Sequence, residues 1–260
     1  MKIEYDHSKN RHTLRGPQAF LPYLFAMNKP SSLIDVGCGT GLWTKAAMDL
    51  GVKDALGLDG VPVPPDQLVI PRERFLVQDF TEDWDLKRHF DMALCLEVAE
   101  HLDQQHAARL VKNLSVHSNT IVFSAACPGQ AGQHHVNCQW PAYWQKLFNA
   151  QGFVCDDAIK WKIWDDCRLE PWYRQNVFVA TKNPEKAGRE ESFKAVIHPE
   201  FLYGEDYNNI QNASFNSTMA IERGWMTVGW YLRTPIIGLT NKLANRMKAT
   251  KPKKTDATRS

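Results

Sequence analysis

The sequence predicts an α/β fold built on a seven-stranded, mostly parallel sheet. Short apolar segments alternate with helical stretches between residues 31 and 182, and these segments are apolar throughout. Strands without apolar/polar alternation are typical of a parallel sheet that helices cover on both faces. With 260 residues, of which 43% are hydrophobic, the chain is long enough to bury a large core.

The elements follow one another in a regular order. Strands are expected at residues 32–36, 55–58, 75–77, 92–96, 120–124, 153–155 and 176–181. Helices are expected at residues 17–27, 42–50, 103–114 and 140–150; Gly51 ends the second of these, and Pro22 interrupts the first. We therefore expect a helical cover at 1–30, the sheet domain at 31–182, an α-rich C-terminal extension at 183–248 and a disordered basic tail at 249–260.

Composition excludes several classes of protein. Charged residues make up 23% and aromatic residues 11%, which argues against wholesale disorder and against a coiled coil. No apolar run approaches the roughly 18–20 residues that cross a bilayer. The first sixteen residues lack the apolar region of a secretory signal, so a cytoplasmic location is expected.

Charge is distributed unevenly along the chain. Residues 233–260 hold eight of the 31 Lys and Arg residues but one of the 29 acidic residues, Asp256. This leaves residues 1–232 with 23 basic and 28 acidic side chains, so the body is mildly acidic. An acidic body argues against nucleic-acid binding, and an anionic partner is expected to meet the tail instead.

The six cysteines form no Cys-x-x-Cys pair, which predicts reduced thiols and no disulfide framework. Cys127, His134, His135 and Cys138 offer sulfur and nitrogen donors of the kind that bind zinc. Their spacing matches no common zinc pattern, so a loop with two apolar thiols is favoured and no metal site is expected.

The most informative segment is a glycine-rich loop directly after the strand at 32–36. Gly37, Gly39 and Gly41 follow Asp35, and a helix begins immediately afterwards. Glycine allows close approach of the backbone to a ligand, and a helix start offers unpaired N–H groups. A dinucleotide fingerprint requires a third glycine where Leu42 stands, and a phosphate loop requires a Gly-Lys-Ser/Thr end that is absent.

This loop resembles the first motif of the class I S-adenosylmethionine-dependent methyltransferases, Asp/Glu-x-Gly-x-Gly-x-Gly. The resemblance implies a Rossmann-like fold, S-adenosylmethionine as cofactor, and a set of cofactor-binding positions. It assigns Asp59 and Gly60 to the ribose, because a carboxylate accepts two vicinal hydroxyl protons. It assigns Asp79 and Phe80 to the adenine. The segment 90–102, which contains Glu97, Glu100 and His101, resembles the family's "FD…EVxEH" segment, and Glu97 is a further cofactor-binding candidate.

Each of these positions has a structural alternative. Asp35 either contacts the ligand or organises the loop, and ribose binding is the favoured interpretation of Asp59. Asp79 is alternatively a turn residue. Glu97 and Glu100 alternatively face solvent at the start of the next helix, and His101, a substrate-binding candidate, is alternatively a packed histidine.

A closer resemblance covers the chain to about residue 180. Residues 124–144 are similar to a bacterial and phage subfamily that reads "SAAxPGQGGxxHVNEQxPxYW", and residues 172–176, Trp-Tyr-Arg-Gln-Asn, match its "WYRQN" segment. Many members of that subfamily are associated with cell-surface sugars or specialised metabolites. Cys138 stands where the pattern usually has Glu, which puts the catalytic assignment in question.

Methyl transfer to oxygen or nitrogen requires the loss of a proton, which a histidine accepts near neutral pH. His135 aligns with the histidine of the pattern and is the leading candidate for this base, with His134 second. Plain hydrogen bonding is the alternative for both. Trp140, Tyr143 and Trp144 are candidates for the wall of an acceptor pocket, although an aromatic stripe on a helix is more often core.

The basic tail contains an amphipathic pattern. Ile236, Leu239, Leu243 and Met247 share one helical face, with basic residues off it. Such a helix packs on the body or lies on an anionic membrane surface, so residues 233–254 are a candidate for peripheral contact with the inner membrane, and packing is favoured.

The predicted function is methyl transfer from S-adenosylmethionine to a hydroxyl of a small molecule or glycan. N-methylation is an alternative. A macromolecular acceptor is disfavoured by the acidic body and because residues 96–99, Leu-Glu-Val-Ala, replace an Asn-Pro-Pro-Tyr-type tetrad. A catalytically silent cofactor-binding scaffold is the alternative outside the enzymes, and Cys138 is its main support.

Overall fold

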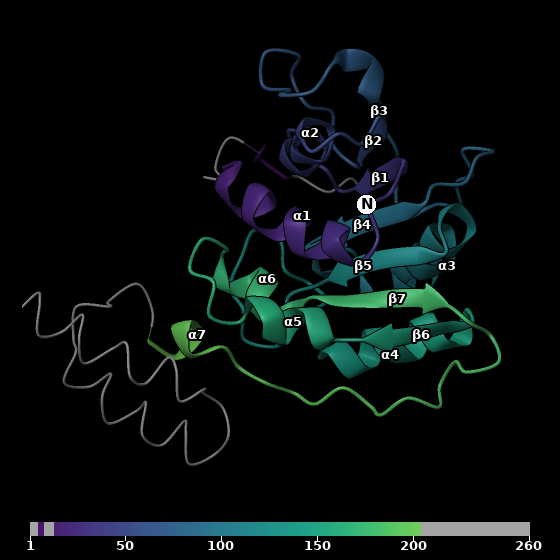
Figure 1. Cartoon of the computed structure of the whole chain (residues 1–260), viewed down its shortest axis with the longest axis vertical. Helices are drawn as coiled ribbons and strands as arrows, with labels where there is room; N and C mark the ends of the chain where they lie inside the picture. Colours follow the sequence, from purple (N-terminus) through teal and green to yellow (C-terminus); the bar gives the residue numbers. More distant parts are fainter. Residues whose placement is uncertain (1–4, 8–12, 204–260) are drawn as a thin grey trace, which may run out of the picture. The chain divides into compact units, whose positions relative to one another are not determined.

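The computed structural model describes residues 5–7 and 13–203 of the chain (Figure 1). The chain divides into two units, residues 1–196 and 197–260. The first unit holds the sheet, and the described part of the second contains helix α7 (Pro199–Tyr203). The C-terminal extension beyond residue 203, including the amphipathic pattern and the tail at 249–260, lies outside the described residues.

The first unit is organised around one seven-stranded sheet with the strand order β3-β2-β1-β4-β5-β7-β6. Its strands are β1 (Ser32–Val36), β2 (Asp54–Asp59), β3 (Phe75–Val77), β4 (Met92–Leu96), β5 (Thr120–Ser124), β6 (Phe153–Asp156) and β7 (Phe178–Lys182). Strand β7 runs antiparallel to both of its neighbours, and every other pairing is parallel. The predicted fold class, a mostly parallel α/β sheet of seven strands, is confirmed.

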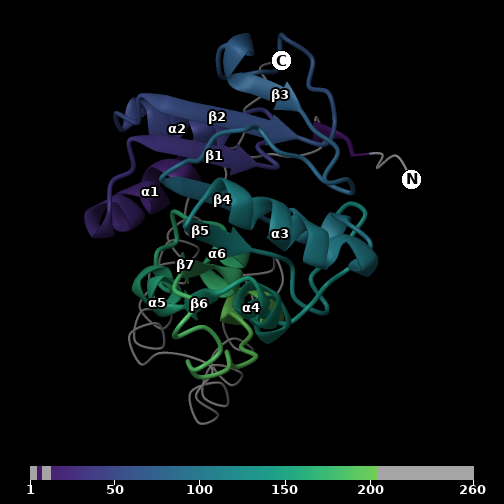
Figure 2. The ribbon, with the colours of Figure 1, turned by 90° about the vertical axis from the view of Figure 1, so that its right-hand side faces the viewer.

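Helices cover both faces of this sheet, as Figure 2 shows. One face carries α1 (Arg15–Met27), α2 (Leu42–Asp49) and α5 (Ala158–Ile163). The other carries α3 (Ala107–His117) and α4 (Pro141–Ala150). Each layer encloses its own apolar cluster, which explains why the parallel strands are apolar on both sides.

The boundaries differ from the predicted ones where short helical turns intervene. The helix expected at 103–114 begins at Ala107, after two 3-10 turns at Ala99–His101 and Gln104–His106; a third such turn is at Arg72–Arg74. Helix α6 (Pro171–Asn176) was not expected, and it moves the start of the last strand to Phe178. Pro171 occupies its first helical position, where the missing N–H costs nothing.

The polar stretch after β7 is held against the sheet domain by side-chain hydrogen bonds. Glu190 Oε1 accepts from Asn149 Nδ2 of α4 at 2.5 Å and from the Cys155 N–H of β6 at 3.0 Å. Gln145 Oε1 accepts from the Phe193 N–H at 2.8 Å. These contacts give the outer strand β6 a polar cover.

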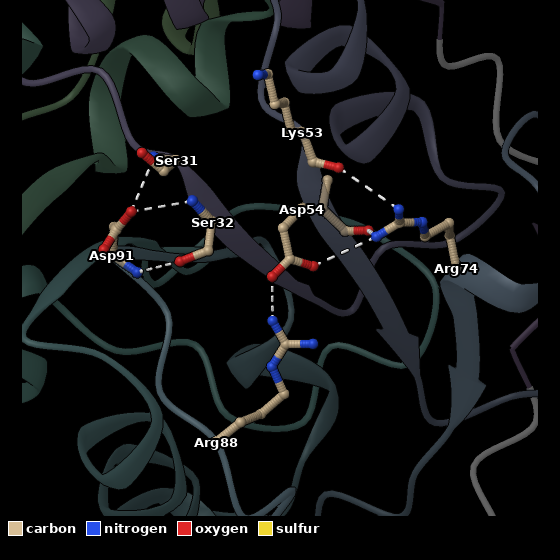
Figure 3. Close-up of polar contacts among 8 residues, drawn as sticks. Ser31, Ser32, Lys53, Asp54, Arg74, Arg88 and Asp91 are labelled. Atoms are coloured by element: carbon tan, nitrogen blue, oxygen red, sulfur yellow. Dashed lines mark hydrogen bonds and ion pairs between the residues drawn. The ribbon is translucent and has the colours of Figure 1, made fainter.

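Ion pairs and hydrogen bonds stabilise the start of the central strands (Figure 3). Asp91 Oδ2 accepts from the N–H groups of Ser31 and Ser32 at 2.8 and 3.0 Å. At the start of β2, the Asp54 carboxylate pairs with Arg74 and Arg88. The polar groups at this amino edge are therefore satisfied by one another.

Among the described residues, no helix has the length and apolar character needed to span a bilayer.

Candidate active site

A cavity of about 290 Å³ opens at the carboxyl ends of β1, β2 and β4. Strand order reverses between β1 and β4, and ligands of open α/β sheets bind outside such a switch point. The cavity extends from the glycine loop through the residues after β2 and β4 to the loop after β5. It therefore lies where the sequence placed the functional residues.

The glycine loop forms one wall of this cavity. Gly37 has φ +81°, and a Cβ there would lie 2.2 Å from Val98 Cγ2, so a side chain is excluded by both conformation and space. The Gly39 N–H donates to Asp59 Oδ2 at 2.8 Å, which ties the loop to the end of β2. Gly37 and Gly39 line the cavity, whereas Gly41 caps α2 and does not.

Asp35 organises the loop from behind. Its buried carboxylate accepts from the Thr44 N–H at 3.1 Å and the Thr44 hydroxyl at 2.8 Å, and it does not line the cavity. Burial raises the pKa of this carboxyl to about 7, and the Thr44 bonds oppose the rise. Of its two predicted roles, the structure supports loop organisation.

Asp59 is placed as predicted, at the end of β2 with Gly60 beside it in the cavity wall. Besides the Gly39 bond, its Oδ1 accepts from the Val61 N–H at 2.9 Å. His7 Nε2 lies 3.4 Å from the same Oδ1. A carboxylate with about four lone-pair positions keeps room for further donors such as hydroxyls.

The two candidate residues after β3, Asp79 and Phe80, differ in where their side chains lie. Phe80 lines the cavity with a buried ring, as predicted. Asp79 is exposed and outside the cavity wall; its Oδ1 accepts from the Thr81 N–H at 2.8 Å and the Thr81 hydroxyl at 2.6 Å. These bonds hold the pKa of Asp79 below its usual value. Asp79 therefore forms a turn with Thr81, and its expected contact with the adenine stays a prediction.

Glu97 follows β4 in a strained backbone conformation, with φ +56°. Non-glycine residues in this region cluster at functional sites, because the surrounding structure must compensate for the strain. Its Oε2 accepts from Gln130 Nε2 at 2.7 Å and its Oε1 from Asn176 Nδ2 at 3.2 Å. The two subfamily segments, which contain Gln130 and Asn176, therefore meet at Glu97.

Glu100 does not face solvent, contrary to one expectation for this segment. Its side chain is fully buried, and burial together with the nearby Glu97 carboxylate holds its pKa well above the usual value. Glu100 and His101 both line the cavity. Burial and the neighbouring His135 lower the pKa of His101 to about 4, so this imidazole is neutral at pH 7.

The loop after β5 separates the two histidine candidates. His135 lines the cavity, and its Nδ1 lies 3.0 Å from the Gln130 carbonyl oxygen. His134 is exposed and outside the cavity wall. Cys138 is half-buried, with its sulfur 3.9 Å from the Gln130 carbonyl oxygen, and burial and the Glu100 and Glu97 carboxylates raise its pKa. Proximity to the cavity favours His135 over His134.

Of the aromatic residues predicted to wall an acceptor pocket, Trp144 belongs to the core, Tyr143 packs against the core, and Trp140 is half-buried just before α4. Trp144 is 1% exposed and packs on Phe123 and Phe148, and neither Trp140 nor Tyr143 lines the cavity. Helix α4 points its aromatic stripe at the sheet, which is the more common use of such a stripe. The aromatic residues that line the cavity are instead Tyr5, Trp43, Phe80, Trp172 and Tyr173, of which the last two come from the Trp-Tyr-Arg-Gln-Asn segment.

The N-terminal segment contributes residues that sequence reasoning missed. Tyr5 packs edge-on against His7 and His101, with ring centroids 5.0 and 4.9 Å away. Gln133 Nε2 donates to the Asp6 carbonyl oxygen at 3.2 Å, which joins this segment to the loop after β5. Residues 5–7 precede every periodic element, so no local pattern marks them as part of the site.

The cavity fits S-adenosylmethionine. Gly37 and Gly39 leave space where a side chain would intrude, Asp59 offers a carboxylate for the ribose hydroxyls, and the Phe80 ring offers an apolar surface for a base. The cluster after β4 and β5 lies beyond this region and is available to a second substrate.

Several solved structures are similar to this chain, and DesVI of Streptomyces venezuelae supports the fold. DesVI is 15% identical, with 69% of this chain and 99% of that chain covered and a TM-score of 0.50. The sugar N-methyltransferase KedS8 of a Streptoalloteichus species is 18% identical, with 68% and 89% covered and a TM-score of 0.48. Magnesium protoporphyrin IX methyltransferase of Synechocystis, with bound SAH, is 16% identical, with 64% and 80% covered and a TM-score of 0.47. No curated protein sequence matches the chain.

A protein-family profile described as "Methyltransferase domain" matches residues 7–144. This range includes His7, the glycine loop, Asp59, the segment after β4 and His135, and it spans more than half of the chain. The chain therefore belongs to the methyltransferase-domain family.

Proposed function

We propose that this protein transfers the methyl group of S-adenosylmethionine to a hydroxyl group of a small molecule or glycan. Family membership supports methyl transfer, and S-adenosylmethionine is the methyl donor that the cavity fits. One observation carries the rest of the proposal: a single cavity joins the glycine loop and Asp59 to the polar side chains of Glu100, His101 and His135. A cofactor and an acceptor can therefore lie side by side.

The sulfonium of the donor supplies the leaving group, so the protein must align the acceptor and exclude water. A hydroxyl acceptor must also lose its proton. His135 is our candidate for that step: a carbonyl oxygen only accepts hydrogen bonds, so Nδ1 carries the proton that faces Gln130, and Nε2 keeps a lone pair. Trp172 and Tyr173 line the cavity and are our candidates for contact with the acceptor.

The proposed pathway is one that builds surface sugars or specialised metabolites, as the subfamily resemblance suggests. N-methylation of an amine is the second candidate reaction. It is favoured by one observation, the neutral His101 beside the cavity, which adds no positive charge to repel a protonated amine.

The proposal is tested first by calorimetric titration of the purified protein with S-adenosylmethionine and S-adenosylhomocysteine. We expect micromolar binding of both, followed by methyl transfer in a screen of sugar and metabolite acceptors. Binding without turnover on any acceptor, with equal thermal stabilisation by both ligands, would support a silent cofactor-binding scaffold instead.

We further propose a cytoplasmic protein whose basic segment 233–254 contacts the inner membrane surface, where lipid-linked glycans are built. The support is sequence pattern alone: one apolar helical face flanked by Lys and Arg residues. Co-sedimentation with anionic liposomes should be lost on deletion of residues 233–260. Equal binding by the shortened protein would contradict the proposal.

A further inference from the structure

Glu100, His101 and His135 form a cluster of potential metal ligands in the cavity wall. One ligand atom from each of them, a carboxylate oxygen and two imidazole nitrogens, lies within 4.8 Å of the other two. We propose that this Glu–His–His cluster binds a divalent cation of the first transition row. From the sequence alone, the only candidate metal ligands are Cys127, His134, His135 and Cys138, and their spacing predicts no site. Glu100 and His135 are far apart in the chain and come together only in the folded structure.

Glu100 supplies the strongest argument for a missing ligand. Its side chain is 0% exposed, and neither carboxylate oxygen makes a hydrogen bond of good geometry among the described residues, although the backbone of Glu100 and Ala126 and the Glu97 carboxyl interact with it. Buried carboxylates are stable when they are paired or bound to a metal, and several kcal/mol is a common order for leaving a buried charge uncompensated. A cation in the cluster would satisfy these oxygens.

The two histidines are arranged as metal ligands usually are. His135 points Nδ1 at the Gln130 carbonyl oxygen, which leaves Nε2 with the lone pair; ligating histidines commonly fix their second nitrogen in this way. The absence of a side chain at Gly132 makes room for that ring, because a Cβ there would lie 2.1 Å from Nε2. His101 Nδ1 is buried and has no hydrogen-bond partner among the described residues.

The ligand set indicates which cations fit. Two imidazoles and one carboxylate suit Mn²⁺, Fe²⁺, Co²⁺ or Zn²⁺, whereas Mg²⁺ prefers oxygen ligands. A cation about 2.1 Å from each ligand holds ligand atoms at most about 4.2 Å apart, so the cluster needs to contract by no more than roughly half an ångström. Three protein ligands leave coordination positions open for water or an acceptor oxygen.

Such a cation deepens the proposed function, and its role in the reaction rests on that function. The acceptor hydroxyl oxygen binds an open position, which lowers the pKa of the hydroxyl, and its proton passes to solvent. The resulting alkoxide forms a bond to the methyl carbon of S-adenosylmethionine. The carbon–sulfur bond breaks, its electron pair stays on sulfur, and S-adenosylhomocysteine leaves. His135 then acts as a ligand in place of a base.

The test is direct binding of Mn²⁺ and Co²⁺ to full-length protein stripped with a chelator. Electron paramagnetic resonance of free Mn²⁺ should give one site per chain, and Co²⁺ should produce visible absorption bands. Because losing one outer-sphere partner already costs about 10–100-fold in affinity, loss of a ligand in Glu100→Gln or His135→Gln should cost about 100-fold or more. Gly132→Ala, which keeps all three ligands but crowds the His135 ring, should weaken binding about tenfold.

Matched controls come from exposed residues of the same types. Glu73→Gln and His89→Ala change a carboxylate and an imidazole outside the cavity and should leave Mn²⁺ binding unchanged. Thermal melting of each variant establishes that it is folded. Absence of a site in the parent protein, or equal Mn²⁺ affinity in the parent and both ligand variants, overturns the proposal.

Titration with S-adenosylhomocysteine in the presence of chelator separates this proposal from the proposed function. Binding of S-adenosylhomocysteine without Mn²⁺ binding leaves the methyltransferase proposal standing and removes the metal. Binding of Mn²⁺ without S-adenosylhomocysteine keeps the metal site and removes its catalytic role. Methyl transfer that chelator abolishes and Mn²⁺ restores supports both.

Discussion

At the amino edge of the sheet, the Asp91 carboxylate accepts hydrogen bonds from two backbone N–H groups, and Asp54 forms ion pairs with two arginines, as Figure 3 shows. At the carboxyl edge, Glu100 is more deeply buried than either of these and makes no hydrogen bond of good geometry among the described residues. The polar groups of the first edge hold the chain. At the second edge Asp35, Asp59 and Glu97 are also hydrogen-bonded, and Glu100 is the exception. The proposed site lies at the edge where one buried carboxyl group, that of Glu100, is not satisfied by the fold.

Positive φ also occurs before the amino ends of β2 and β4, at Gly51 and Lys87, but at the carboxyl edge it includes residues that line the cavity. Gly37, Gly39 and Glu97 all have positive φ at the carboxyl edge. The amino-edge residues Ser31, Ser32, Asp54 and Asp91 have no such strain, since none of them is among the described residues with positive φ. Strain and unpaired polar groups together mark a site that tertiary packing holds in place.

The largest expected effect tests whether aromatic residues at the carboxyl edge contribute less to the free energy of unfolding than aromatic residues of the core do. Trp144→Ala should lower the free energy of unfolding by about 3–5 kcal/mol, because it removes a buried ring from the layer between α4 and the sheet. Trp172→Ala, in the half-buried cavity wall, should cost much less stability and should weaken acceptor use. Urea unfolding followed by fluorescence measures the first effect, and equal losses in the two variants would contradict the distinction.

The next effect concerns cofactor affinity. Asp59→Ala should weaken binding of S-adenosylhomocysteine about 100-fold, since two charge-assisted hydrogen bonds to the ribose and the Gly39 contact are lost. Asp54→Ala, at the other end of the same strand, is the matched control and should bind normally. Calorimetric titration measures both, and parent-like affinity in Asp59→Ala would remove it from the cofactor site.

A pH-dependent gain in stability is expected in Glu100→Gln. Because the folded-state pKa of Glu100 is raised, its contribution to stability is complete below the unfolded value near 4.5 and declines as the pH rises. In the presence of chelator, the variant should therefore match the parent near pH 4. At pH 8 it should be more stable by about 1 kcal/mol or more, which is roughly 2–4 °C in Tm per kcal/mol. Melting curves at both pH values measure the difference, and a variant less stable at pH 8 would show that Glu100 is satisfied in the folded protein.

The smallest effect belongs to the amino edge. Asp54→Ala should lower the free energy of unfolding by about 1 kcal/mol or less, because its ion pairs with Arg74 and Arg88 are partly exposed. The loss should shrink in 0.5 M salt, which screens exposed charges. Denaturant unfolding at two salt concentrations tests this. A loss of more than about 3 kcal/mol in the free energy of unfolding would show that Asp54 contributes more than an exposed ion pair does.

Local sequence patterns predicted most of the sheet. The strands at 32–36, 75–77, 92–96 and 120–124 have the predicted bounds. Short apolar segments bounded by polar residues and glycines are a pattern that predicts a strand and both of its ends. Helix α6 was missed, since six residues give too little periodicity to recognise. The aromatic stripe of α4 was assigned to a pocket as a candidate, and only its packing against Phe123 settles that it is core.

The sequence by itself determined the fold class, the glycine loop and the position of Asp59, because each depends on residues adjacent in the chain. Tertiary structure decided which groups share the cavity. It placed Glu100 and His135 together from separate loops, brought Tyr5 and His7 from the N-terminal segment, and turned Asp35, Asp79 and Trp144 away. The physical reason is that a side chain's burial and partners depend on the segments that pack around it, and these contacts join residues too distant in sequence for any local pattern to record.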